Sequence, residues 1–190
     1  LPNSAAMRIW NTPTGKAKSR RWYPTLVETG AGKYVDFGGV GKLLKPVYPD
    51  HPQDSLTNVK QVERFDPATG KWTLYPKAAD YDLPLYPRVH LLPNGHVLFN
   101  AGGQDFNPFG QSTGETNWID LATFDPRSAT WRKLGTANTA TPTAPGFRGS
   151  TSSTMLPLTP DANGRYAKAS FLTAGGVLLT SPGSYLATAE

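Results

Sequence analysis

Apolar residues in this chain fall in short runs that are separated by glycine, proline, asparagine and aspartate. Runs of about four to eight residues between such turn formers predict β-strands. An amphipathic helix would instead show apolar positions that recur every three or four residues, and long stretches of that kind are missing here. The pattern therefore predicts an all-β protein.

One pattern occurs twice, and a degraded copy of it stands near the start of the chain. The stretch Arg64–Trp72 recurs as Thr123–Trp131, and both copies place Phe-Asp-Pro ahead of a tryptophan; the degraded copy is Ile9–Lys16. Asp-Pro initiates turns because proline pre-sets φ. Each full copy therefore predicts a hairpin in which one strand ends at the phenylalanine and the next begins at the tryptophan.

A second pattern alternates with the first and ends at a pair of glycines. It reads as a strand, a turn and another strand. Its three copies are Arg21–Gly39, Tyr86–Gly103 and Ser153–Gly176, the last with an inserted turn through Asp161–Gly164. Together the two patterns give four strands per unit, which is the blade of a β-propeller.

We therefore predict a partial kelch-type β-propeller of four-stranded antiparallel blades across residues 1–190. Residues 1–17 would supply the last strand of one blade, 18–76 and 77–136 would form blades, and 137–190 would start the next one. Propellers need about four to eight blades. A partial array leaves strand edges and apolar faces uncovered. We therefore expect the remaining blades to come from a longer polypeptide that is nicked or truncated, or from another chain.

The units are longer than the usual kelch period of about 50 residues. The excess falls in segments 41–58 and 104–117, which are rich in proline, glycine and asparagine. Both connect the second strand of a unit to the third. We expect them to be surface loops at one end of the propeller, where binding residues often lie.

Composition narrows the possible partners. The formal net charge of +5 comes from scattered basic residues, with one dense cluster at Lys16, Lys18, Arg20 and Arg21, so we expect no nucleic-acid partner. No apolar run is long enough for a membrane span, and no signal-peptide pattern opens the chain, which we expect to be processed or cut from something longer. The absence of cysteine excludes disulfides and thiolate metal sites within these residues.

The string Arg21-Trp22-Tyr23-Pro24-Thr25, followed by a strand, a glycine-containing turn and Gly38-Gly39, resembles the copper radical oxidases. This is the galactose oxidase and glyoxal oxidase group, and the bacterial glyoxal-oxidase-like proteins are the most similar. The resemblance continues through Phe65–Trp72, Tyr86–Phe99 and Gly149–Leu158 and so covers most of the chain. The Phe-Asp-Pro turn is common to kelch proteins, whereas Arg-Trp-Tyr-Pro-Thr at the start of a blade is more specific.

The resemblance implies a secreted, seven-bladed propeller with one copper ion near its axis, held by two tyrosines and two histidines. One tyrosine is cross-linked to a cysteine through a thioether, and this residue maps onto Tyr23 as copper ligand and radical. Copper(II) accepts one electron and the phenoxyl radical the second, so an aldehyde or primary alcohol is oxidised and dioxygen yields hydrogen peroxide. From their own chemistry, Arg21 and Arg88 are candidates to lie near the axis and hold an anionic or carbonyl substrate through the guanidinium group.

Departures from the family limit what the chain does alone. Without cysteine, the cross-link requires a cysteine outside these residues. No Tyr-His dipeptide is present, so the other copper ligands belong to later blades. Galactose oxidases carry a tryptophan just after the glycine pair, where this chain has Val40-Gly41, which favours the glyoxal-oxidase-like branch. The alternative function is a non-catalytic propeller that binds a glycan or a protein through its long loops.

Several candidate residues have structural alternatives. Tyr23 could simply pack between blades, since Tyr86 occupies the equivalent place in the next blade. Arg21 and Arg88 would form inter-blade salt bridges. The histidines His51, His90 and His96 offer a metal site only if His90 and His96 approach across their turn with other ligands.

The tryptophans divide in the same way. Trp72 and Trp131 recur at matching positions of the repeat, so we expect them to pack in the core. Trp118 follows a polar loop and remains a candidate for ligand contact. No serine-histidine-aspartate arrangement, phosphate loop or paired-carboxylate signature is recognisable in the sequence.

Overall fold

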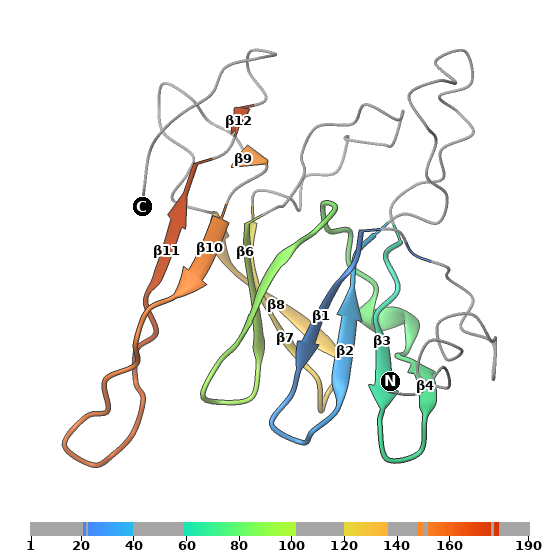
Figure 1. Cartoon of the computed structure of the whole chain (residues 1–190), viewed down its shortest axis with the longest axis horizontal. Helices are drawn as coiled ribbons and strands as arrows, with labels where there is room; N and C mark the ends of the chain where they lie inside the picture. The colour runs from blue at the N-terminus through green and yellow to red at the C-terminus, as the bar shows by residue number, and fades with distance from the viewer. Residues whose placement is uncertain are drawn as a thin grey trace, which may run out of the picture.

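The structure is a computed structural model of the whole chain; it describes Arg21 and residues 23–39, 59–101, 120–136, 148–149, 152–175 and 177–178. Within these ranges the chain forms twelve β-strands and one short 3₁₀ helix, η2 (Lys77–Ala79) (Figure 1). The all-β prediction is confirmed for this part of the chain. Residues 1–17, the segments 41–58 and 104–117, His51 and Trp118 lie outside the described residues.

Eight strands form two antiparallel four-stranded sheets in which strands that follow each other along the chain are neighbours. The first sheet contains β1 (Thr25–Glu28), β2 (Tyr34–Phe37), β3 (Glu63–Asp66) and β4 (Lys71–Leu74), and the second contains β5 (Arg88–Leu91), β6 (Val97–Ala101), β7 (Asp120–Asp125) and β8 (Thr130–Thr136). Phe65 pairs with Trp72, and Phe124 pairs with Trp131, at the same place in each sheet. The predicted four-stranded unit is therefore present twice.

Both Asp-Pro turns that the sequence predicted are present, and the aspartate side chain stabilises each of them. Asp66 Oδ1 accepts a hydrogen bond from the Ala68 backbone N–H at 3.0 Å, and Asp125 Oδ1 accepts one from Arg127 at 2.9 Å. The turns then pass through left-handed residues, with φ of 65° at Gly70 in the first turn and 57° at Ala129 in the second. The same local chemistry thus closes both hairpins.

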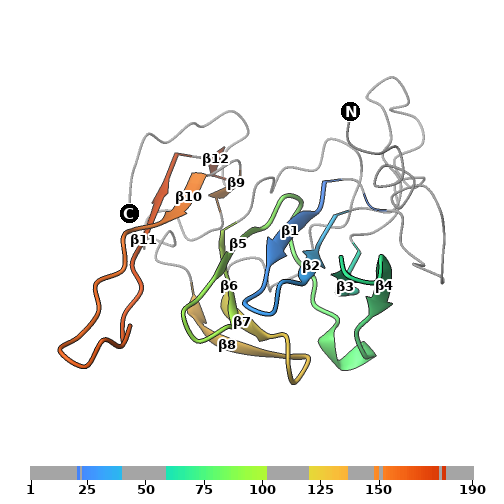
Figure 2. The same ribbon diagram turned by 60° about the horizontal axis from the view of Figure 1, so that its bottom comes forward.

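A third antiparallel pair begins beside the second sheet. It consists of β10 (Ser152–Met155) and β11 (Phe171–Ala174), and β9 (Arg148–Gly149) pairs with β12 (Val177–Leu178). The connection 156–170 is mostly exposed and extends away from the two sheets (Figures 1 and 2). Asp161 closes its tip by accepting backbone hydrogen bonds from Asn163 and Arg165 at 2.8 and 2.9 Å, so the inserted turn is confirmed.

The apolar core lies between the two sheets. Phe37 of β2 contacts Phe124 and Trp131 of the second sheet edge-on, with ring centroids 5.5 and 5.7 Å apart. Trp131 also donates its indole N–H to the carbonyl oxygen of Ala79 in η2 at 2.9 Å. Fully burying a side chain such as Phe37 stabilises the fold by about 1.5–3 kcal/mol. Trp131 is thus a core residue, as predicted.

The outer faces of this stack remain partly uncovered. Trp72 packs against Phe65 at 5.1 Å on the face of the first sheet that points away from the second. At the other end, Leu172 of β11 and Leu156, which follows β10, are 40% and 39% exposed. Apolar side chains are therefore partly open to solvent on both sides of the stacked sheets. No helix in the described ranges is long and apolar enough to cross a membrane.

The first glycine of the pair after β2 has a steric role. Gly38 has a φ of +66°, and a Cβ there would lie 3.1 Å from Pro87 Cγ and 3.2 Å from the Pro84 carbonyl oxygen. Pro84 and Pro87 lie just before β5, so a side chain at position 38 would push the second sheet away from the first. The glycine permits this close approach.

Comparing Gly38→Ala with Gly70→Ala tests this role. Both residues have a φ near +65°, but a Cβ at Gly70 would meet nothing within 4 Å. We expect Gly70→Ala to lower the free energy of unfolding by about 1–2 kcal/mol through backbone strain alone, and Gly38→Ala to lower it further through the clash with Pro87. Urea unfolding of the full-length polypeptide measures both losses, and equal losses would refute the steric role.

Candidate functional site

Two tyrosines at equivalent positions of the two sheets meet where the sheets adjoin. Tyr23 precedes β1 and Tyr86 precedes β5, each followed by a proline. Their backbones are left-handed, with φ of 62° and 52°. A residue before proline normally prefers an extended backbone, and a non-glycine residue in such a sparsely populated region costs about 1–3 kcal/mol. Backbone strain of this kind is typical of functional sites.

The two tyrosines contact each other through ring and backbone. Their rings stack with centroids 4.5 Å apart and an angle of 26° between the ring planes. The backbone N–H of Tyr86 donates to the carbonyl oxygen of Tyr23 at 2.9 Å. Burial raises the pKa of Tyr86 above its ordinary value of 10.0, and the charge of Tyr23 and a hydrogen bond to it raise this pKa further. The phenol of Tyr86 therefore stays protonated at physiological pH.

Arg21 lies two residues before Tyr23 and is anchored to the first sheet. Its Nε and Nη2 donate to Glu63 Oε2 at 3.0 and 2.6 Å, and Nε lies 3.3 Å from Asp36 Oδ2. All three side chains are almost fully buried. Asp36 belongs to β2 and Glu63 to β3, so these ion pairs lie within one sheet, whereas the sequence suggested a salt bridge between blades. The inter-blade interpretation is wrong for this pair of contacts.

Asp36 is the strained member of this cluster. One guanidinium faces two carboxylates, and Asp36 Oδ1 has no hydrogen-bond partner. Burial raises the pKa of Asp36 from 3.8 to about 7; the charge of Arg21 lowers it, and that of Glu63 raises it again. At neutral pH a proton on Asp36 relieves the excess negative charge.

A hydrogen bond and a close packing contact link the Arg21 cluster to the segment that carries Tyr86. Arg21 Nη1 donates to the carbonyl oxygen of Gly38 at 3.1 Å, and Gly38 is in close contact with Pro87, the residue after Tyr86. The turn that carries Tyr23 is thus tied to the strand end against which the Tyr86 segment packs. Both tyrosines are held by buried neighbours on rigid elements, as a preorganised site requires.

His90 belongs to a different polar cluster, between the second sheet and the third strand pair. Its Nε2 lies 3.0 Å from Ser153 Oγ, which also interacts with Asn100 at 2.8 Å and Thr173 at 3.4 Å. Burial lowers the pKa of His90. Because the hydroxyl of Ser153 is shared by several partners, we interpret this cluster as a polar link between the second sheet and β10–β11. No motif in the sequence predicts this cluster.

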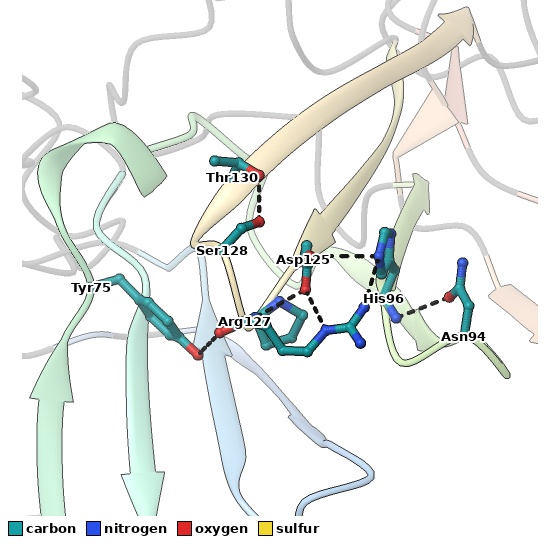
Figure 3. Close-up of polar contacts among 8 residues, drawn as sticks. Tyr75, Asn94, His96, Asp125, Arg127, Ser128 and Thr130 are labelled. Atoms are coloured by element: carbon teal, nitrogen blue, oxygen red, sulfur yellow. Dashed lines mark hydrogen bonds and ion pairs between the residues drawn. The ribbon is translucent and has the colours of Figure 1, made fainter.

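His96 lies at the tip of the second sheet, with other partners. Figure 3 shows it beside Asp125 and Arg127, with its Nε2 3.7 Å from Asp125 Oδ2 and 3.5 Å from Arg127 Nη2. Its backbone N–H donates to Asn94 Oδ1 at 3.0 Å. His90 and His96 therefore have separate partners instead of a shared site.

The described residues do not make a copper site by themselves. Among them, no three histidine, cysteine, aspartate or glutamate side chains come together as metal ligands. Tyr23 supplies a phenol, and it is the only position here onto which a ligand of the copper radical oxidases maps. A copper ion would need its remaining ligands from outside the described residues.

Comparison with known proteins leaves the family open. No family model and no curated protein matches the chain. Among solved structures the chain is similar to that of YjhT, with a TM-score of 0.45 and 15% sequence identity. The match covers 82% of this chain and 44% of that protein, so the chain spans less than half of its length. No family follows from this likeness, and the functional argument rests on the chain's own residues.

Asp36→Asn tests the charge imbalance beside Tyr23. Between pH 3.8 and about 7 the unfolded chain loses the Asp36 proton while the folded chain keeps it, so this residue makes stability fall as pH rises through that window. We expect the variant to lack this decline and to gain stability over the wild type above pH 7. Urea unfolding at several pH values measures it, with Asp80→Asn as the control outside the cluster. A pH slope identical to that of the wild type would show that Asp36 ionises normally.

Proposed function

We propose that this chain supplies tyrosine-bearing blades of a secreted copper radical oxidase that oxidises an aldehyde or a primary alcohol with dioxygen and releases hydrogen peroxide. In this proposal the two four-stranded sheets are blades of a kelch-type propeller with seven blades. Tyr23 is the copper ligand and radical residue. The other ligands and the cysteine of the cross-link come from blades outside this chain.

The observation that carries the proposal is the backbone conformation of Tyr23. A packing tyrosine in a strand needs no left-handed backbone, and the proline after it makes that conformation still less favourable. Tyr23 adopts it next to a buried ion-pair cluster and under a stacked ring. A side chain fixed in this way is suited to a role in which the direction of its phenol oxygen matters.

The motif supports the same role. Tyr23 stands in Arg21-Trp22-Tyr23-Pro24-Thr25, the part of the sequence with the most specific resemblance to the copper radical oxidases. The guanidinium of Arg21 pairs with Asp36 and Glu63. We therefore assign Arg21 the role of holding the Tyr23 turn, rather than that of contacting substrate. Binding of an aldehyde or alcohol then depends on residues that remain to be found in the other blades.

The test uses the full-length polypeptide loaded with copper. We expect peroxide release from small aldehydes and the optical absorption of a tyrosyl radical, and we expect Tyr23→Phe to abolish both because it lacks the phenol oxygen. Tyr166→Phe is the matched control, since Tyr166 is 49% exposed on the connection 156–170. If the copper-loaded wild type gives neither peroxide nor radical, the oxidase is excluded. Retention of the protein on immobilised glycans would then favour a binding module.

A further inference from the structure

We propose that Tyr86 is the positioning residue of Tyr23, fixing both the plane of its ring and the place of its phenol oxygen. This inference rests on the proposed role of Tyr23 as ligand and radical residue. Tyr86 was expected to be a repeat copy of Tyr23 and evidence for plain packing. The structure instead brings the two equivalent residues into contact with each other.

Two contacts join the pair, and each restrains a different degree of freedom. The stacked rings, 4.5 Å apart, fix the ring plane of Tyr23. The hydrogen bond from the Tyr86 N–H to the Tyr23 carbonyl oxygen, at 2.9 Å, fixes the backbone from which that ring projects. Together they determine where the phenol oxygen of Tyr23 lies.

Energetics argue against plain packing as the reason for the pair. A stacked aromatic pair adds only modestly to the stability gained by burying its area. Two left-handed residues before proline together cost more than such a stack contributes. Tyr81 and Trp131 achieve an equivalent stack, at 4.5 Å and 22°, without a positive φ at either residue. Stacking in this protein therefore does not require strain, and the strain at Tyr23 and Tyr86 serves the placement of their side chains.

The Tyr81–Trp131 pair also supplies the matched control. Tyr81→Leu and Tyr86→Leu each remove one ring from a stack of the same geometry, but only Tyr86 contacts Tyr23. Tyr86→Phe keeps the ring and removes the hydroxyl. The three variants separate loss of the stack, loss of the hydroxyl and general loss of stability.

The experiment places 3-fluorotyrosine at position 23 of the full-length polypeptide without copper and records its ¹⁹F spectrum. We expect Tyr86→Leu to shift the resonance of residue 23, because the ring current and the restraint on ring orientation are lost. Tyr86→Phe should retain most of the wild-type shift, and Tyr81→Leu should retain all of it. An unchanged resonance in Tyr86→Leu, or an equal shift in Tyr81→Leu, would overturn the inference.

A second measurement covers the case in which Tyr86→Leu does not fold. With 3-fluorotyrosine at position 86, Tyr23→Leu should shift the resonance of residue 86, because it removes the ring stacked on it at 4.5 Å. Tyr81→Leu should leave that resonance unchanged. If Tyr23→Leu has no effect, the two rings do not contact each other and the inference fails.

Activity then separates this inference from the proposed function. In the copper-loaded enzyme, we expect Tyr86→Leu to lower kcat by about 100-fold with little change in KM, as misplacement of a reacting group does. Tyr86→Phe should recover most of that loss. If the wild-type enzyme is inactive but Tyr86→Leu gives the expected ¹⁹F shift, the proposed oxidase activity is overturned and the contact between Tyr86 and Tyr23 is supported. If the enzyme is active and Tyr86→Leu leaves kcat unchanged, the positioning role of Tyr86 is overturned and the proposed oxidase activity is supported.

Discussion

The contact between the two four-stranded sheets is the interaction on which the candidate site depends. Phe37 of β2 packs edge-on against both Phe124 and Trp131 of the second sheet, and the apolar area buried there sets the spacing of the sheets. That spacing brings the start of β1 beside the start of β5, so Tyr23 and Tyr86 can stack. Gly38 matters for the same reason, since it lets the Pro87 segment approach.

Buried charge is the second constraint on this region. Arg21, Asp36 and Glu63 leave solvent together, and removing the guanidinium from such a buried cluster is strongly destabilising. The orphaned Asp36 oxygen and its raised pKa show that the compensation is incomplete. The fold tolerates this cost directly beside a tyrosine with a strained backbone. Backbone strain and buried charge are expected to occur together where a protein holds a fixed geometry at the expense of local stability.

The described residues contain one part of the candidate site but not another. The tyrosine pair is complete within the described residues, whereas metal ligands are not brought together there. The side chains of Leu156 and Leu172 are 39% and 40% exposed on the side of the β10–β11 pair that faces away from the second sheet.

The sequence by itself determined the strands, the Asp-Pro turns, the four-stranded unit and the core position of Trp131. These features depend on local chemistry: side-chain alternation in strands, the fixed φ of proline, and carboxylates such as those of Asp66 and Asp125 capping their own turns. Only the tertiary structure decided that Tyr86 covers Tyr23, that Arg21 pairs within its own sheet, and that His90 bonds Ser153. The Arg21–Glu63 pair joins residues 42 positions apart and exists only once the first sheet has formed. The Tyr23–Tyr86 stack and the His90–Ser153 bond, the latter 63 positions apart, exist only once the sheets have stacked. A pattern that repeats along the chain shows that two tyrosines are equivalent, but it does not show that they touch.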